Sequence, residues 1–163
     1  MGPLEGWGAA FRYTGRAAQA VQRLKYARAT SLAGPLATEL ASAVSGFGLD
    51  GVDAIVPVPI HWRRRFLRGF NQAELLCTGF DPTRLRPEWL VRARATTPQA
   101  SLHGAARLAN LADAFVASPE VQGLTLLLVD DVRTSGRTFE ACALALKAAG
   151  AQSVFGVAVA GGA

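Results

Sequence analysis

The chain has 163 residues, a length typical of one domain. Half of the residues are hydrophobic and 18% are charged, which excludes a mainly disordered or fibrous protein. Lysine and arginine number 17 against 12 acidic residues, so the formal net charge is +5. All but two of the cations are arginines, whose planar fork suits phosphate and carboxylate groups. The surplus indicates an anionic partner but does not separate nucleic acid from a phosphorylated metabolite.

No membrane segment or metal framework is predicted. The longest strongly apolar runs, residues 124–129 and 154–160, are far shorter than the roughly 18 residues that a membrane helix needs. The first residues match neither a signal peptide nor a myristoylation signal. We therefore expect a cytoplasmic protein without membrane insertion. Cys77 and Cys142 stand alone, without metal-binding spacing, so we expect both to be buried as small hydrophobic side chains.

The sequence pattern of the first third of the chain predicts two helices and a strand. Residues 16–29 carry apolar side chains at helical spacing and present a basic outer face. Residues 30–46 predict a second helix, capped by Thr30 or Ser31 and ended by glycines. Residues 52–58 form a short apolar run closed by prolines, which favours a strand of a parallel sheet covered on both faces.

The middle of the chain is less regular. Residues 71–79 predict a helix that begins at Asn71, and residues 89–94 predict a strand. Residues 96–104 are polar and irregular, so we expect an exposed loop there, followed by a short helical turn over residues 105–112.

The last forty residues carry the clearest pattern. Residues 124–129 predict a buried strand that stops at the acidic pair that follows, and a helix is expected from about Gly136 to a left-handed cap at Gly150. A final strand over residues 153–160 completes a strand–helix–strand unit, whose two strands are parallel. The predicted class is α/β, with an open parallel sheet and helices on both faces.

Polar residues gather between the first strand of this unit and its helix. They are Asp130, Asp131, Thr134, Ser135, Gly136 and Thr138. Ligands of open α/β sheets bind beyond the carboxyl ends of the strands, and a helix N-terminus favours phosphate. Two carboxylates would repel that phosphate unless they bind sugar hydroxyls or magnesium. We interpret the segment as a ribose-phosphate site, and the alternative is that these side chains only cap the helix.

Residues 129–138 combine an apolar strand end, two acidic residues and a Thr/Ser-Gly-x-Thr loop. This segment resembles the phosphoribosyl pyrophosphate (PRPP) motif of type I phosphoribosyltransferases, a superfamily that includes the amidophosphoribosyltransferases. More narrowly, the chain resembles the ComF competence family from about Tyr13 to Val159. The shorter motifs that carry this second resemblance lie at residues 24–26, 55–59, 68–72 and 97–99, and at Arg107, Asn110 and Phe115.

The resemblance implies a type I phosphoribosyltransferase fold over residues 1–163, as one domain. A small N-terminal helical hood would span about residues 1–50 and the core about residues 51–163. ComF proteins commonly carry a cysteine-rich zinc module before this domain, and the sequence has no cysteines that match it. Lys25 and Tyr26 would lie near the hood, where acceptor specificity is normally set in the superfamily.

The resemblance also implies the ligand-binding residues. The acidic pair would meet the ribose hydroxyls and help to place magnesium, the implied cofactor, while the following loop would cradle the 5-phosphate. The implied PRPP-binding set is Asp130, Asp131, Val132, Arg133, Thr134, Ser135, Gly136, Arg137 and Thr138. The implied pyrophosphate-binding set is Pro59, Ile60, His61, Trp62, Arg63 and Arg64.

Four residues are candidate catalytic residues. Asp130 and Asp131 hold the sugar, and Gln99 and Arg107 lie in the segment that matches a mobile loop, which closes over bound substrate in relatives. The chemistry is displacement at the anomeric carbon, in which positioning and charge stabilisation dominate. This interpretation gathers several of the arginines around one phosphate-binding cleft.

Two functions are implied, and they differ in whether the protein turns over. One is transfer of a phosphoribosyl group from PRPP to a nitrogen acceptor, linked to natural competence and DNA uptake. The other is a non-catalytic protein that binds PRPP, a nucleotide or single-stranded DNA and acts with competence proteins such as a helicase or a recombination mediator. A homodimer is expected only by analogy with the superfamily.

The basic run from Arg63 to Arg65, with Arg68 nearby, has three interpretations. It is a pyrophosphate clamp, a surface for single-stranded DNA on which Trp62, Phe66 and Phe70 stack, or a solvated turn whose aromatic side chains face the core.

Overall fold

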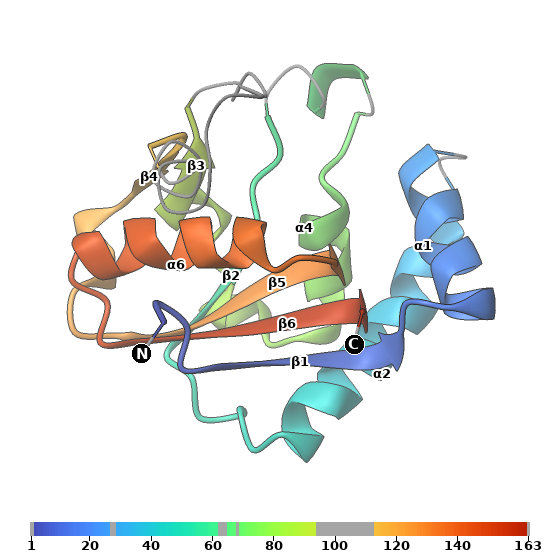
Figure 1. Cartoon of the computed structure of the whole chain (residues 1–163), viewed down its shortest axis with the longest axis horizontal. Helices are drawn as coiled ribbons and strands as arrows, with labels where there is room; N and C mark the ends of the chain where they lie inside the picture. Colours follow the sequence, from blue (N-terminus) through green and yellow to red (C-terminus); the bar gives the residue numbers. More distant parts are fainter. Residues whose placement is uncertain (1, 27–28, 62–64, 68, 94–112, 163) are drawn as a thin grey trace.

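A four-stranded parallel sheet forms the centre of the computed structural model, which describes residues 2–26, 29–61, 65–67, 69–93 and 113–162 (Figure 1). The strands lie in the order β1-β6-β5-β2, and every neighbouring pair is parallel. Their bounds are Gly6–Arg12 for β1, Ala54–Pro57 for β2, Thr125–Arg133 for β5 and Ser153–Gly161 for β6. The carboxyl ends of all four strands therefore meet at one edge of the sheet, as the predicted α/β class requires.

Helices cover both faces of this sheet. Leu126 and Leu128 of β5 pack in one apolar cluster with α6 (Arg137–Ala148). Leu127 and Val129 point to the other face, where they join a second cluster. That cluster includes α1 (Gly15–Tyr26), α2 (Ala33–Gly46) and α4 (Gln72–Leu76). Figure 1 shows α6 in front of the strands and α2 and α4 behind them. The alternation of side chains along β5 explains this two-layer burial, and the predicted buried strand is confirmed.

The strand β1 is not among the elements predicted from the sequence. It contains two glycines and lacks a clear apolar alternation, but it pairs along its length with β6, more than 140 positions away in the sequence. The ring of Phe47, just after α2, packs over Gly8, and a Cβ atom there would displace this half-exposed ring. Long-range pairing thus overrides a weak local signal.

The two N-terminal helices are confirmed, but the cap predicted for the second helix, Thr30 or Ser31, is wrong. A short 3-10 turn over Thr30–Leu32 leads directly into α2, whose N-cap residue is Leu32. Neither this residue nor the one before the turn donates or accepts a side-chain capping hydrogen bond. Because the turn already continues the helical path, it supplies backbone partners that a hydroxyl cap would otherwise provide.

The prediction that the strand stops at the acidic pair is also wrong. β5 continues to Arg133, and its last residues stay in register with β6, with Asp130 opposite Ala158 and Val132 opposite Ala160. The backbone ladder does not depend on side-chain polarity, so β6 holds these polar residues in strand conformation. The consequence is that Asp130 and Asp131 project to opposite faces of the sheet.

Most of the remaining predicted elements are confirmed. Gly150 follows α6 with φ 99°, as a left-handed cap requires. β3 (Leu90–Arg92) pairs antiparallel with β4 (Phe115–Ala117) beside α6. Both cysteines are buried. The predicted loop over residues 96–104 and the turn over residues 105–112 lie outside the described residues. None of the described helices has the length and apolar character that a membrane span requires.

Asn71 fastens α4 to the end of β2. Its Nδ2 atom donates to the carbonyl oxygen of Val58 at 3.1 Å, and its Oδ1 atom accepts from the backbone N–H of Ala73 at 3.1 Å. The side chain is buried. The predicted helix start at Asn71 is therefore confirmed, and the same side chain fixes where α4 begins relative to the sheet.

We expect Asn71→Ala to destabilise the protein by roughly 2–4 kcal/mol, because it removes a helix cap and leaves a buried carbonyl unpaired. Chemical denaturation monitored by circular dichroism measures the change. Asp81→Ala is the matched control, because Asp81 caps the exposed turn Pro82–Arg84 in the same way but is not buried. A loss for Asn71→Ala no larger than for the control would contradict the anchoring role.

Candidate functional site

A cavity of about 260 Å³ lies at the carboxyl ends of β2 and β5. Its walls come from both helical layers and from the loops that follow the two strands. The lining residues are Lys25, Tyr26, Val58, Pro59, Ile60, Gln72, Arg92, Asp130, Asp131, Val132, Thr134 and Thr138. Segments that are distant in the sequence therefore meet where open parallel sheets bind their ligands.

A second cavity, of about 320 Å³, lies between α2 and the segment that follows α4. Its described lining residues are mostly apolar, and the one cation among them, Arg84, already donates to the carbonyl oxygens of Asp50 and Val52. None of the predicted ligand-binding residues that the structure describes lines it. The cavity at the strand ends is therefore the better candidate site, although it is the smaller of the two.

The acidic pair has one member on each face of the sheet. Asp131 is 4% exposed and forms an ion pair with Lys25 of α1, with 3.0 Å between Nζ and Oδ1. Asp130 lies on the side of α6 and accepts a hydrogen bond from the backbone N–H of Asp131 at 2.8 Å. The two carboxylates are adjacent in sequence but have different partners, so they are electrostatically distinct.

Burial raises the pKa of Asp130 well above its ordinary value, and the negative charge of Asp131 raises it further. The hydrogen bond from the backbone of Asp131 and the charge of Lys25 act in the opposite direction but are weaker. On the α6 side, burial and the nearby Asp130 raise the pKa of the Cys142 thiol. Both groups therefore stay protonated to a higher pH in the folded protein than in the unfolded chain.

The loop after β5 turns sharply into α6. Gly136 has φ 77°, a left-handed conformation that side chains disfavour, and a Cβ atom there would lie 2.5 Å from Nη2 of Arg133. Thr134 and Thr138, before and after this turn, are exposed and line the cavity. The free N–H groups of the first turn of α6 and two hydroxyls thus lie together at the helix N-terminus.

Seven of the predicted site residues line this cavity together. They are Pro59, Ile60, Asp130, Asp131, Val132, Thr134 and Thr138. Five others are described but do not line it: His61, Arg133, Ser135, Gly136 and Arg137. Trp62, Arg63, Arg64, Gln99 and Arg107 lie outside the described residues.

Arg133 points to the amino-terminal strand instead of the cavity. Its guanidinium carbon stacks 3.7 Å from the centroid of the Trp7 ring, a close cation–π contact. Trp7 belongs to β1, the strand that the sequence did not predict, so this contact had no sequence signal. The stack holds the end of β5 against the edge of the sheet.

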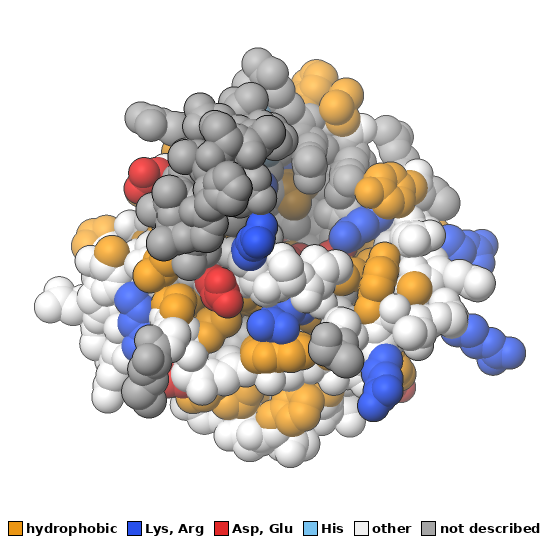
Figure 2. Space-filling view, in the orientation of Figure 1, with side chains coloured by type: hydrophobic (Ala, Val, Ile, Leu, Met, Phe, Trp, Pro, Cys, Tyr) orange, Lys and Arg blue, Asp and Glu red, His pale blue; other side chains and the backbone are white. Residues whose placement is uncertain are grey.

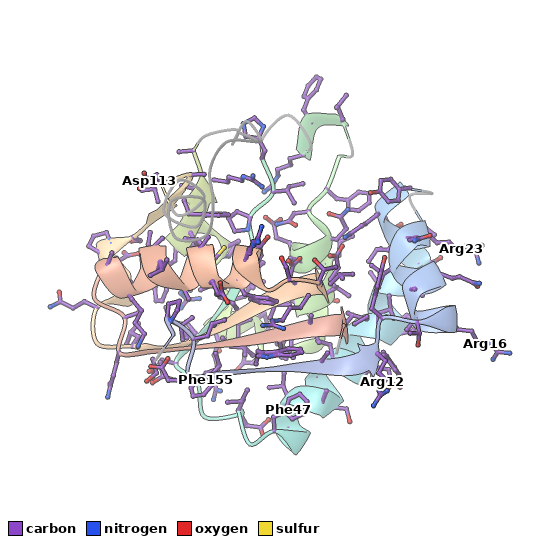
Figure 3. The ribbon with its side chains drawn as sticks, in the orientation of Figure 1. Arg12, Arg16, Arg23, Phe47, Asp113 and Phe155 are labelled. Atoms are coloured by element: carbon purple, nitrogen blue, oxygen red, sulfur yellow. The ribbon has the colours of Figure 1, made fainter. Side chains whose placement is uncertain are left out.

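Many of the other arginines also lie away from the cavity. Arg12 projects from the end of β1, and Arg16 and Arg23 project outward from α1 (Figure 3). Figure 2 shows the basic side chains spread over this face of the molecule. The basic outer face predicted for α1 is confirmed, and part of the positive surplus is therefore a solvated surface.

Three lining residues were missed as site residues in the sequence: Val58, Gln72 and Arg92. Lys25 and Tyr26 were placed only near the hood. Gln72 had a usable signal, since it follows Asn71 at the start of a short helix whose other buried positions, Ala73 and Leu76, are apolar. A polar side chain at a position that the helix buries indicates a special role.

No family model matches the chain. Among the curated proteins, it is 38% identical over 150 residues to DNA utilization protein YhgH of Salmonella typhimurium, with 87% of this chain and 66% of that protein covered. It is 37% identical over 142 residues to the YhgH protein of Escherichia coli K12, with 82% and 62% covered. Competence protein F of Haemophilus influenzae is 33% identical over 114 residues, with 63% and 47% covered.

These matches support a relation to the ComF family. The chain spans slightly less than two thirds of the length of the YhgH proteins and about half of the competence protein. The ComF resemblance that was based on short motifs is thus supported by relatives aligned over most of this chain.

Asp130 makes stability depend on pH. Because its pKa is higher in the folded protein than its ordinary value of 3.8, the folded state binds more protons, and stability falls as pH rises above that value. We expect Asp130→Asn to remove this loss and to be more stable than the unmodified protein at about pH 8.

Thermal unfolding midpoints measured from about pH 4 to about pH 8 check this expectation. Asp113→Asn is the matched control, since Asp113 is exposed and belongs to a different part of the surface (Figure 3). Parallel profiles for the unmodified protein and Asp130→Asn would show that the carboxyl group of Asp130 is not protonated on folding.

Proposed function

We propose that this protein binds PRPP in the cavity at the strand ends, within a type I phosphoribosyltransferase fold, and acts in competence and DNA utilization. One observation carries the proposal: the acidic pair and the hydroxyls of Thr134 and Thr138 open onto the same cavity as Pro59 and Ile60. The names of the relatives, DNA utilization protein and competence protein, supply the cellular context.

The lining residues divide among the parts of the ligand. The 5-phosphate would bind at Thr134 and Thr138, where the N-terminus of α6 adds backbone donors and a favourable dipole. The ribose hydroxyls would bind the acidic pair in the middle. The diphosphate would extend along Pro59 and Ile60 at the end of β2.

The acidic pair suits a magnesium ion only if the ligand brings further donors. Carboxylate oxygens are ligands that magnesium prefers, but the described residues contain no group of three or more His, Cys, Asp or Glu side chains that could hold a metal. Asp131 is moreover already paired with Lys25. Asp130 and Asp131 would hold a magnesium ion only together with donor atoms of PRPP, and the ion would neutralise part of the diphosphate charge.

The reaction that such a site supports is phosphoribosyl transfer. The bond from the anomeric carbon to a diphosphate oxygen breaks, a bond to the acceptor nitrogen forms, and the nitrogen loses a proton while pyrophosphate leaves. No side-chain nucleophile is needed, so the protein contributes position and charge. Lys25, 3.0 Å from Asp131, supplies a cation on the α1 side of the cavity. The alternative is a protein that holds PRPP without turnover.

Calorimetric titration of PRPP with magnesium tests the proposal. We expect the unmodified protein and Asp113→Asn to bind, and the double variant Asp130→Asn/Asp131→Asn to lose about tenfold or more in affinity, because charge-assisted hydrogen bonds to the sugar and metal are lost. Absent binding, or equal binding by the double variant, would overturn it.

Turnover is then decided by assaying pyrophosphate release with candidate bases and amines as acceptors. Release that depends on an acceptor and disappears in the double variant identifies an enzyme. Binding without release under any of these acceptors identifies the non-catalytic alternative.

Single-stranded DNA is a second candidate ligand, and one observation favours it. Phe66 is 85% exposed. The interpretation in which the aromatic side chains of the basic run face the core is therefore wrong for this residue. Phe70 is half-buried, and Arg65 pairs with Glu74 at 2.7 Å. An exposed aromatic ring beside a basic run is a stacking platform for bases.

We expect Phe66→Ala to weaken binding of a labelled single-stranded oligonucleotide by roughly 1–3 kcal/mol, the value of one base stacked on an aromatic ring. Affinity should also fall as salt rises. Fluorescence anisotropy measures both. Phe47→Ala is the matched control, since Phe47 is exposed at the far end of α2 (Figure 3). Affinity that responds neither to salt nor to Phe66→Ala would remove this candidate.

A further inference from the structure

Gln72 is a buried polar residue without an evident structural partner. The residue lines the cavity and is only 2% exposed. Among the residues that the structure describes, its Nε2 atom has no hydrogen-bond partner. Buried amides are nearly always paired in folded proteins, so an orphan of this kind calls for an explanation.

The local structure does not explain why an amide is needed there. Gln72 is the first residue of α4, and the capping contacts at this end are made by Asn71 instead. The neighbouring Ala73 and Leu76 of the same helix are buried in apolar surroundings. An apolar side chain of similar length would avoid the cost of desolvating an unpaired amide. The residue is therefore unfavourable for the fold when no ligand is bound.

The position of Gln72 relative to the cavity walls is well defined. The hydrogen bond from Asn71 to the carbonyl oxygen of Val58 ties the start of α4 to the end of β2. Gln72 therefore lies beside the segment where Pro59 and Ile60 line the cavity. Thr138 belongs to α6, in the opposite helical layer. The amide is thus at the β2 end of the site, away from the proposed 5-phosphate position.

The cations that line the cavity, Lys25 and Arg92, make an anionic oxygen a suitable missing partner. Lys25, from the same helical layer as α4, lies 3.0 Å from Asp131, and Arg92 belongs to β3. An amide N–H directed at a phosphate oxygen makes a charge-assisted hydrogen bond, which is stronger than one to a neutral group.

We propose that Gln72 is a ligand-binding residue whose Nε2 atom donates to a diphosphate oxygen of PRPP. The inference rests on the proposed function and adds a side-chain contact to the diphosphate end of the site. The ligand supplies the partner that the amide lacks. The amide thus costs stability without ligand and gains its hydrogen bond in the bound state.

Two variants separate this role from a structural one. Gln72→Met keeps the length of the side chain but removes the donor, and Gln72→Glu puts a carboxylate beside the diphosphate. We expect Gln72→Met to keep or raise the thermal unfolding midpoint while it weakens PRPP binding about tenfold, and Gln72→Glu to weaken binding further. Gln22→Met, at an exposed position of α1, is the matched control and should change neither quantity.

The choice of probe locates the contact. Ribose 5-phosphate lacks the diphosphate, so its affinity should be unchanged in Gln72→Met, whereas the affinities for PRPP with magnesium and for pyrophosphate should fall. Calorimetric titration of the three probes against the unmodified protein and the variants measures this difference.

The outcomes distinguish the inference from the function on which it rests. If ribose 5-phosphate and PRPP bind the unmodified protein and Gln72→Met weakens both equally or neither, the diphosphate contact is wrong while the proposed function stands. A lower unfolding midpoint for Gln72→Met with unchanged PRPP affinity makes Gln72 structural and also overturns the inference. If neither probe binds the unmodified protein, the proposed function fails and the inference fails with it.

Discussion

The pairing of β5 with β6 is the interaction on which the candidate site depends. Because the ladder continues past Asp130 to Arg133, two polar residues are held in strand conformation, and they face opposite layers of helices. Asp131 therefore meets Lys25 of α1, whereas Asp130 lies on the side of Cys142 in α6. Had the strand ended at the acidic pair, neither carboxylate would have a fixed direction. Backbone hydrogen bonds thus decide the electrostatics of the cavity.

The cavity concentrates groups that are unfavourable for folding. Burial and the charge of a neighbour oppose ionisation of Asp130, and the buried amide of Gln72 lacks a partner among the described residues. The apolar clusters on the two faces of the sheet supply the stability that tolerates them. Because these groups are unfavourable without ligand, a ligand that provides the missing partners stabilises the folded protein more.

The sequence predicted those parts of the fold that depend on local periodicity. The apolar run of β5, the spacing of α6 and the glycine that ends it each reflect neighbours along the chain. β1 could not be predicted, because its conformation depends on β6, a strand from the other end of the chain. For the site, the acidic pair and the hydroxyls of the following loop were predicted. The stacking of Arg133 on Trp7 was not, since it arises from a tertiary contact, and Gln72 was missed although a polar residue at a buried helix position was a signal.

The two buried thiols resist alkylation in the folded protein. Burial raises the pKa of Cys77 to about 12, and Cys142 is shifted in the same direction beside Asp130. Since alkylating reagents attack the thiolate, neither cysteine reacts while its surroundings stay closed. The two thiols lie in different apolar clusters, one on each face of the sheet. Their separate labelling rates therefore report how often each helical layer opens, without any introduced probe.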